Sequence, residues 1–348
     1  MHRWSGLTLG ILFAVIGVTG SVLALQPEIL RGLHPALNSA EVTGVSRGQA
    51  LEHLLRSAQA ADITAIDLPS QRLPAWQAYT ALDRRHYFDA ATGDWLLTRD
   101  VDSDWLLWLR ALHTHLLAGE SGEQVLGISG LLLILLLASG VYLWWPRWHS
   151  VRASLRWHRQ PPVLRWLSWH RSSGALLSTA LLILSVTGVA MIYGAPVRAA
   201  LRWTAGEGAE VTAPLPLPSR SAPIPWADVL RAAQEAMPDA ELRRIALPRA
   251  DNAWVLIRAR QAGEWHPNGR SLIWIDPYQA RVEKTHRAMA QGWGSRLDEM
   301  LYPIHGGFVG GLTWLGSVIV LGLAPLFLLI TGSLLWWTKR QLRQRSGL

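Results

Sequence analysis

The chain has 348 residues, no cysteine and a formal net charge of +8 at neutral pH. The absence of cysteine excludes disulfides, thiolate zinc sites, iron–sulfur clusters and covalently attached c-type haem, so any metal must be bound by histidine, carboxylate or methionine. Half of the residues are hydrophobic, and the basic residues are unevenly placed, which indicates a membrane topology and no nucleic-acid partner.

Long apolar runs divide the chain. Each run reaches the roughly 20 residues that a helix needs to cross a bilayer core of about 30 Å. Apart from Arg171 at the edge of the third, the apolar part of each run holds no charged residue. We therefore predict an α-helical integral membrane protein that contacts membrane lipid. The predicted transmembrane helices are residues 1–25, 124–145, 169–193 and 312–337.

The charges between these runs predict the orientation of the chain. All 25 acidic residues lie in segments 26–123 and 194–311, whereas loop 146–168 and tail 338–348 are basic and hold no acid. By the positive-inside rule, the loop, the tail and both termini are cytoplasmic. The first run is long for a signal peptide and ends without a good cleavage site, so we expect a retained helix.

An internal repeat relates the two halves of the chain. His113 is followed 27 residues later by Gly140, and His305 is followed 27 residues later by Gly332. In both copies a Trp-Trp pair begins four residues after that glycine. The chain is therefore two repeated helix pairs. Further matches at identical offsets join His2-Arg3, Gly6 and Val18-Thr19-Gly20 to His170-Arg171, Gly174 and Val186-Thr187-Gly188.

The two acidic segments have the pattern of small α+β domains. In segment 26–123, Ser46 is a plausible N-cap for a helix, and short β-branched and aromatic runs at 63–66 and 78–82 precede a hairpin at 87–94. Segment 194–311 opens with an extended proline-rich linker at 214–225, followed by a helix from Trp226. Strand-like runs then occupy 242–247, 253–260 and 271–275. The repeat thus extends to two periplasmic α+β domains.

Four histidines recur at equivalent positions of the repeat. His2 and His170 belong to cytoplasmic helix ends, and His113 and His305 to outer ends. Imidazole is a common axial ligand of haem iron, and non-covalent b-type haem needs no cysteine. Two pairs on opposite sides of one membrane therefore predict two haem b groups per chain, one bound through each pair. His115 is unpaired in the repeat and is a possible accessory ligand.

Two other interpretations of these histidines remain open. A histidine at a membrane interface can simply contact lipid headgroups. Zinc or copper at one pair would usually need a third ligand. Glycines around the outer pair would break the helix and make room for the edge of a macrocycle; they are Gly119, Gly122, Gly306, Gly307, Gly310 and Gly311.

Taken together, these motifs resemble the PepSY-associated transmembrane-helix family over nearly the whole chain. The resemblance rests on the His-Arg…Thr-Gly openings, on the repeated His…Gly…Trp-Trp segments, and on two PepSY-like modules containing Asp89-Ala90-Ala91-Thr92-Gly93 and Asp276-Pro277. It implies four transmembrane helices, two periplasmic PepSY-like domains and, in reductase members, b-type haems on helix histidines. The short leader before His2 is the least well matched part.

The resemblance also implies an activity and a location. It suggests an oxidoreductase of the bacterial inner membrane that reduces a periplasmic ferric siderophore, or another Fe(III) chelate, and releases Fe(II) for uptake. Loop 146–168 is too short to house a flavin domain, so the expected electron donor is a separate cytoplasmic reductase or quinol. The alternative is a non-enzymatic scaffold or sensor whose PepSY-like domains bind a periplasmic partner. No catalytic residue is predicted in the outer segments.

Overall fold

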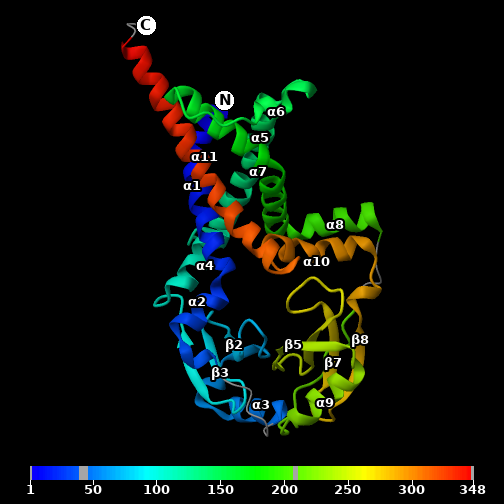
Figure 1. The fold of residues 1–348 in the computed structure, drawn as a ribbon. Helices are drawn as coiled ribbons and strands as arrows, with labels where there is room; N and C mark the ends of the chain where they lie inside the picture. The colour runs from blue at the N-terminus through cyan, green and yellow to red at the C-terminus, as the bar shows by residue number, and fades with distance from the viewer. Residues whose placement is uncertain (1, 39–45, 207–210, 346–348) are drawn as a thin grey trace. The chain divides into compact units, whose positions relative to one another are not determined.

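The computed structural model describes residues 2–38, 46–206 and 211–345 (Figure 1). The first residue of the predicted first helix and the last three residues of the predicted tail lie outside this range. The chain divides into two compact units. The helical unit comprises residues 1–24, 109–195 and 301–348, and the sheet unit comprises 25–108 and 196–300.

The helical unit is built from long apolar helices that correspond to the four predicted runs. They are α1 (His2–Ala24), α5 (Gly119–Trp144), α7 (Pro162–Ile192) and α11 (Gly311–Arg345). Among the described residues, these four helices are long and apolar enough to cross a membrane, which agrees with the prediction of a helical membrane protein. Helices α5, α7 and α11 begin before their predicted runs, so His170 lies inside α7 rather than at its end. Between α5 and α7, the loop forms the short helices η3 (Trp148–Ser150) and α6 (Val151–Ser154).

The four long helices lie side by side and pack as the repeat requires (Figure 1). Helix α1 packs on α11, and the equivalent helices of the repeat, α7 and α5, also pack on one another, so both contacts join the two halves of the chain. Gly17 of α1 and Gly322 of α11 face one another so closely that a Cβ at Gly17 would lie 2.2 Å from the Gly322 carbonyl oxygen. At the same crossing, the Ser21 hydroxyl donates to the carbonyl of Ile319 at 2.8 Å. Small residues and a hydroxyl thus take the place of the hydrophobic effect inside the bilayer.

A shorter helix precedes each of the membrane helices α5 and α11. Helix α4 (Trp105–His115) ends with His113 and His115, and α10 (Trp293–His305) ends with His305. Between α10 and α11 the chain reverses at Gly307, Gly310 and Gly311, which have positive φ angles of 82°, 66° and 63°. The predicted break is present there, because glycine adopts this region without a Cβ clash. Gly122 differs from the prediction and lies within α5.

The described residues of the sheet unit form one eight-stranded antiparallel sheet, in the order β4-β3-β2-β1-β5-β6-β7-β8. The two predicted α+β modules each supply four strands, and they join where β1 pairs with β5. The strands are β1 (Ile63–Asp67), β2 (Ala75–Thr80), β3 (Arg85–Asp89), β4 (Trp95–Arg99), β5 (Ala240–Ala246), β6 (Val255–Gln261), β7 (Ser271–Asp276) and β8 (Arg281–His286).

Local signals explain the sheet unit's helices and hairpins. Ser46 caps α3 (Arg47–Arg56) in a capping box with Gln49, as the predicted N-cap requires. Asp89 accepts hydrogen bonds from the amides of Ala91 and Thr92 at the β3–β4 hairpin, and the Asp276 carboxylate accepts the Tyr278 amide at the β7–β8 hairpin. The faint sequence repeat of the outer segments therefore corresponds to equivalent turns.

The core of the sheet unit is shared by both modules. Helices α3 and α9 (Trp226–Ala236) contribute Leu51, Leu54, Val229 and Ala233 to a single buried cluster on one face of the sheet. The remaining helices of this unit are α2 (Gln26–Leu33), α8 (Gly194–Ala205), which begins in the helical unit, and the short turns η1 (Pro35–Leu37), η2 (Ala58–Ala60) and η4 (Ala288–Ala290). The proline-rich stretch before α9 contains no helix or strand between residues 211 and 225.

Candidate functional site

The helical unit brings the four repeated histidines together in two pairs. The rings of His2 and His170 have centroids 6.4 Å apart with an interplanar angle of 77°. The rings of His113 and His305 have centroids 6.3 Å apart at 51°. These are the pairings that the repeat and the topology predict, formed by residues 168 and 192 positions apart along the chain. Their role as ligands remains a prediction.

The outer histidines are each held by a helix of the bundle through the Nδ1 atom. His113 Nδ1 lies 3.0 Å from the Ile16 carbonyl oxygen and 3.0 Å from Thr19 Oγ1, both on α1. His305 Nδ1 lies 3.0 Å from the Leu184 carbonyl oxygen and 3.2 Å from Thr187 Oγ1, both on α7. The first repeat copy of the Thr-Gly motif therefore holds one outer histidine and the second copy holds the other.

The inner histidines are held in the same manner by the other two long helices. His170 Nδ1 lies 3.0 Å from the Leu328 carbonyl oxygen and 3.3 Å from Thr331 Oγ1 of α11. His2 Nδ1 lies 2.9 Å from Ser139 Oγ of α5. Each long helix thus has a hydroxyl residue three positions after the residue whose carbonyl lies beside it. These groups contact the Nδ1 atom of a histidine that belongs to another helix.

This network assigns the tautomer of all four rings. The hydroxyls of Thr19 and Ser139 donate to carbonyls within their own helices, at 2.9 and 2.8 Å, and those of Thr187 and Thr331 do so at 2.8 and 2.9 Å. Their oxygens therefore accept from the imidazole, so each Nδ1 carries the proton. Nε2 keeps its lone pair, which is the state a metal-ligating histidine needs.

A glycine follows each hydroxyl residue, and the histidine ring packs against this glycine in the space that a Cβ atom would otherwise occupy. A Cβ on Gly20 would lie 2.9 Å from Cε1 of His113, and one on Gly188 would lie 3.1 Å from Cε1 of His305. The equivalent distances are 3.1 Å for Gly140 and His2, and 3.4 Å for Gly332 and His170. We call each hydroxyl residue with its following glycine a histidine cradle: Thr19-Gly20, Ser139-Gly140, Thr187-Gly188 and Thr331-Gly332.

The spacing of each pair fits two imidazoles on opposite sides of one metal ion. With a metal–nitrogen bond of about 2 Å and a ring centroid about 1.2 Å behind its nitrogen, the two centroids would be about 6.4 Å apart. The observed 6.4 and 6.3 Å agree with this value. Within residues 2–38, 46–206 and 211–345, no group of three or more His, Asp or Glu side chains could hold a metal ion. A two-ligand centre such as haem therefore suits the pairs better than zinc does.

The inner end also offers donors for an acidic group. Arg165 Nε and Arg171 Nε, which flank His170 on α7, are buried without a hydrogen-bond partner among the described residues, as is Nδ1 of His158 in loop 146–168. A buried donor without a partner is costly, and the carboxylates that haem b carries would satisfy such donors. His158 itself is partly exposed.

His115 belongs to neither pair. Its Nδ1 is buried without a hydrogen-bond partner, and its carbonyl oxygen packs against Gly122, where a Cβ would approach to 1.9 Å. His115, the possible accessory ligand, therefore has a buried ring nitrogen without a partner. Among the described residues, it contacts neither histidine pair.

The cradles are the part of the candidate site that the sequence alone did not reveal. The repeat identifies Thr19-Gly20, Thr187-Gly188 and the glycines at 140 and 332. Their contacts with histidines of other helices, however, are formed only in the folded structure. Ser139 is harder still to recognise from the sequence, because the equivalent residue of the second copy is Thr331. A search for a hydroxyl residue before every repeated glycine would have found all four.

A comparison with protein families finds a match over nearly the whole chain. The family model described as PepSY-associated TM region covers residues 1–339. No curated protein matches the chain.

Proposed function

The chain belongs to the PepSY-associated transmembrane family, and from this premise we propose that it is a di-haem b reductase of the bacterial inner membrane. It passes electrons from a cytoplasmic reductase or a quinol to a ferric siderophore or another Fe(III) chelate in the periplasm. The observation that carries the proposal is the presence of two histidine pairs, each at the ring spacing of bis-histidine ligation and each with Nδ1 occupied.

The protein's own residues prepare the two sites. The carbonyl and hydroxyl of each cradle orient one imidazole and increase the basicity of its Nε2. The glycines allow the rings to lie against the helix backbone, and the apolar helices exclude water. Bound haem supplies one-electron transfer, and reduction of Fe(III) to Fe(II) weakens chelation by hard oxygen donors, so the metal is released.

The topology supports a direction for the electrons. His170 lies on α7, which follows the basic, acid-free loop 146–168, and its ring pairs with that of His2. The positive-inside rule places this loop in the cytoplasm. His113 and His305 end the helices that follow the acidic sheet unit. The inner pair is therefore the receiving site and the outer pair the delivering site.

Removing one histidine at a time tests this function. His113→Ala or His305→Ala should remove the outer haem, and His170→Ala the inner one, so that each variant keeps about half of the wild-type haem, as two independent bis-histidine sites imply. In every variant, electrons from a cytoplasmic donor should no longer reach a periplasmic ferric chelate, while dithionite still reduces the remaining haem. His149→Ala, at an exposed loop histidine, is the matched control and should change nothing.

The result that overturns the proposal is equally specific. If His113→Ala and His305→Ala leave both the haem content and the reductase activity unchanged, the pairs are structural. The non-enzymatic scaffold or sensor would then be the better account of the chain.

A further inference from the structure

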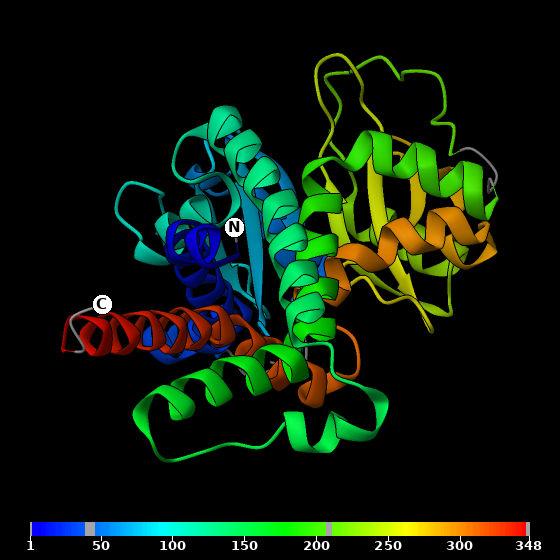
Figure 2. The same ribbon diagram turned by 90° about the horizontal axis from the view of Figure 1, so that it is seen from above.

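The sheet unit contains a polar pocket that the proposed electron path does not use. Its volume is about 130 Å³, and α8 and α10 form most of its wall. These helices run side by side (Figures 1 and 2), because Gly294 of α10 lets the α8 backbone approach: a Cβ there would lie 2.6 Å from the Leu201 carbonyl oxygen. The polar side chains of the pocket are Arg198, Arg202, Gln291, Ser295, Asp298 and Glu299.

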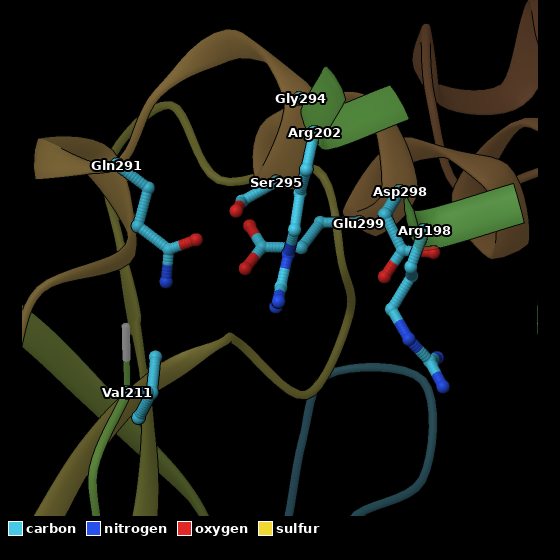
Figure 3. A pocket seen from close by; sticks show the side chains of 8 residues that line it. All are labelled: Arg198, Arg202, Val211, Gln291, Gly294, Ser295, Asp298 and Glu299. Carbon is cyan, nitrogen blue, oxygen red and sulfur yellow. The ribbon is translucent and has the colours of Figure 1, made fainter. Parts of the chain in front are cut away.

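Two arginines face this pocket from one side of α8. Arg198 and Arg202 are four residues apart, so they lie on the same helix face and repel one another. Figure 3 shows Arg202 and Glu299 reaching toward the middle of the pocket, with Arg198 and Asp298 together at one side. Within the described part of the chain, no ion pair joins either arginine to an acidic group. Both guanidinium groups therefore keep hydrogen-bond donors that no described acidic residue occupies.

A third arginine adds positive charge beside the pocket. Arg270 acts electrostatically on both Asp298 and Glu299, and its Nε is buried without a hydrogen-bond partner. A buried guanidinium nitrogen without an acceptor costs free energy that an incoming oxyanion would recover. The planar donor fork of arginine matches a carboxylate with two parallel hydrogen bonds.

The nearby acids compensate these arginines only in part. Burial is the main cause that raises the pKa of Glu299, and the net value is about 7 after Glu264 and Asp298 add to the increase and Arg270 and Arg296 oppose it. Burial also raises the pKa of Asp298. Near neutral pH a substantial fraction of Glu299 is therefore protonated, and the pocket keeps an excess of positive charge.

We propose that this pocket binds a carboxylate-bearing arm of the Fe(III) chelate through Arg198 and Arg202, with the positive charge of Arg270 beside it. This inference rests on the proposed function, because it assigns that reductase a substrate class: anionic, carboxylate-containing chelates. The pocket is smaller than the roughly 300–1,000 Å³ that encloses a drug-sized ligand. It therefore holds one arm of the chelate, with the metal centre outside.

Binding of a redox-inert chelate by the intact, haem-loaded chain tests the assignment. The probe is Ga(III)–citrate, titrated calorimetrically into protein in detergent. The double variant Arg198→Gln/Arg202→Gln should bind it at least tenfold more weakly, the loss expected for about one charge-assisted hydrogen bond. Both positions are exposed, so the variant should keep its haem content and its unfolding temperature.

Two control arms sharpen the test. Arg249→Gln/Arg281→Gln removes two arginines elsewhere in the sheet unit whose side chains are 72% and 64% exposed, and it should bind Ga(III)–citrate as the wild type does. A cationic tris-hydroxamate chelate of Ga(III) should gain no affinity from Arg198 and Arg202. Glycerol phosphate, a mimic of an anionic lipid headgroup, should compete only weakly.

The outcomes separate this inference from the proposed function. If the wild type fails to bind Ga(III)–citrate, or the double variant binds it equally well, the pocket is not a chelate site even when the protein is a haem reductase. If glycerol phosphate displaces the chelate with equal affinity, the site recognises phosphate and the assignment is wrong. Binding that depends on the two arginines in a chain without haem would refute the reductase alone.

Discussion

Replacement of single glycines in the cradles should affect the histidine pairs in proportion to the room available. In Gly20→Ala, the new Cβ would lie 2.9 Å from Cε1 of His113, whereas carbon atoms prefer about 3.5 Å or more, so the ring must move by roughly 0.6 Å. In Gly332→Ala the corresponding distance to His170 is 3.4 Å, so a shift of roughly 0.1 Å suffices. The two substitutions are chemically identical and differ only in this clearance.

The tolerance of a metal–ligand bond converts these shifts into an expected result. Ligand distances in metal sites stay within about 0.2 Å of their preferred values, so Gly332→Ala should be tolerated and Gly20→Ala should not. Loss of correct ligand orientation typically lowers affinity about 10- to 100-fold. We therefore expect Gly20→Ala to lose most of the outer haem while Gly332→Ala keeps both.

Haem content per chain and the low-spin electron paramagnetic resonance signals of the two sites measure this difference. Gly188→Ala and Gly140→Ala, both at 3.1 Å, should fall between the extremes. The reasoning is refuted if Gly20→Ala retains two unchanged bis-histidine signals, or if Gly332→Ala loses as much haem as Gly20→Ala.

Three further predictions concern the sheet unit and the topology. Asp67 on β1 accepts from Tyr79 on β2 and from Arg244 on β5, so Asp67→Asn should lower the free energy of unfolding by about 1–3 kcal/mol. Asp251→Asn, in an exposed pair with Arg249, should change the free energy of urea-induced unfolding by less than about 0.5 kcal/mol. The pKa of Glu299 is raised to about 7 in the folded chain, so the folded state binds an extra proton between about pH 4.3 and 7. As pH rises through that range, the wild type should therefore lose thermal stability relative to Glu299→Gln. Parallel profiles of unfolding temperature against pH for the two proteins would contradict this. Reporter fusions after Gly44 and Pro218 should be periplasmic, and those after Arg152 and Leu348 cytoplasmic; Gly44 and Leu348 lie outside the described residues, and a cytoplasmic signal from an acidic segment would overturn the topology.

The histidine pairs could be predicted from the sequence because the repeat places each histidine at a fixed offset from an apolar run. Equal offsets put His2 and His170 at one side of the membrane, and His113 and His305 at the other. A pairing of His2 with His113 and of His170 with His305 is then excluded, because a hydrocarbon core of about 30 Å is too wide for one metal ion to bridge. Periodicity and charge segregation were sufficient for this step.

The remaining features depend on contacts between distant segments. That Ser139 holds His2 cannot be read from either local sequence, because helix packing sets the contact. Likewise, β1 and β5 join the two predicted modules into one sheet through a register that hydrophobic alternation alone does not specify. The pocket arises only because Gly294 brings α10 against α8.

The absorption spectrum of the purified full-length protein tests the central claim most directly. Protein from haem-replete cells should be red, with a b-type spectrum and about two haems per chain, because two histidine pairs are present and no cysteine can attach haem covalently. A colourless preparation, or haem that resists extraction because it is covalently bound, would contradict the account.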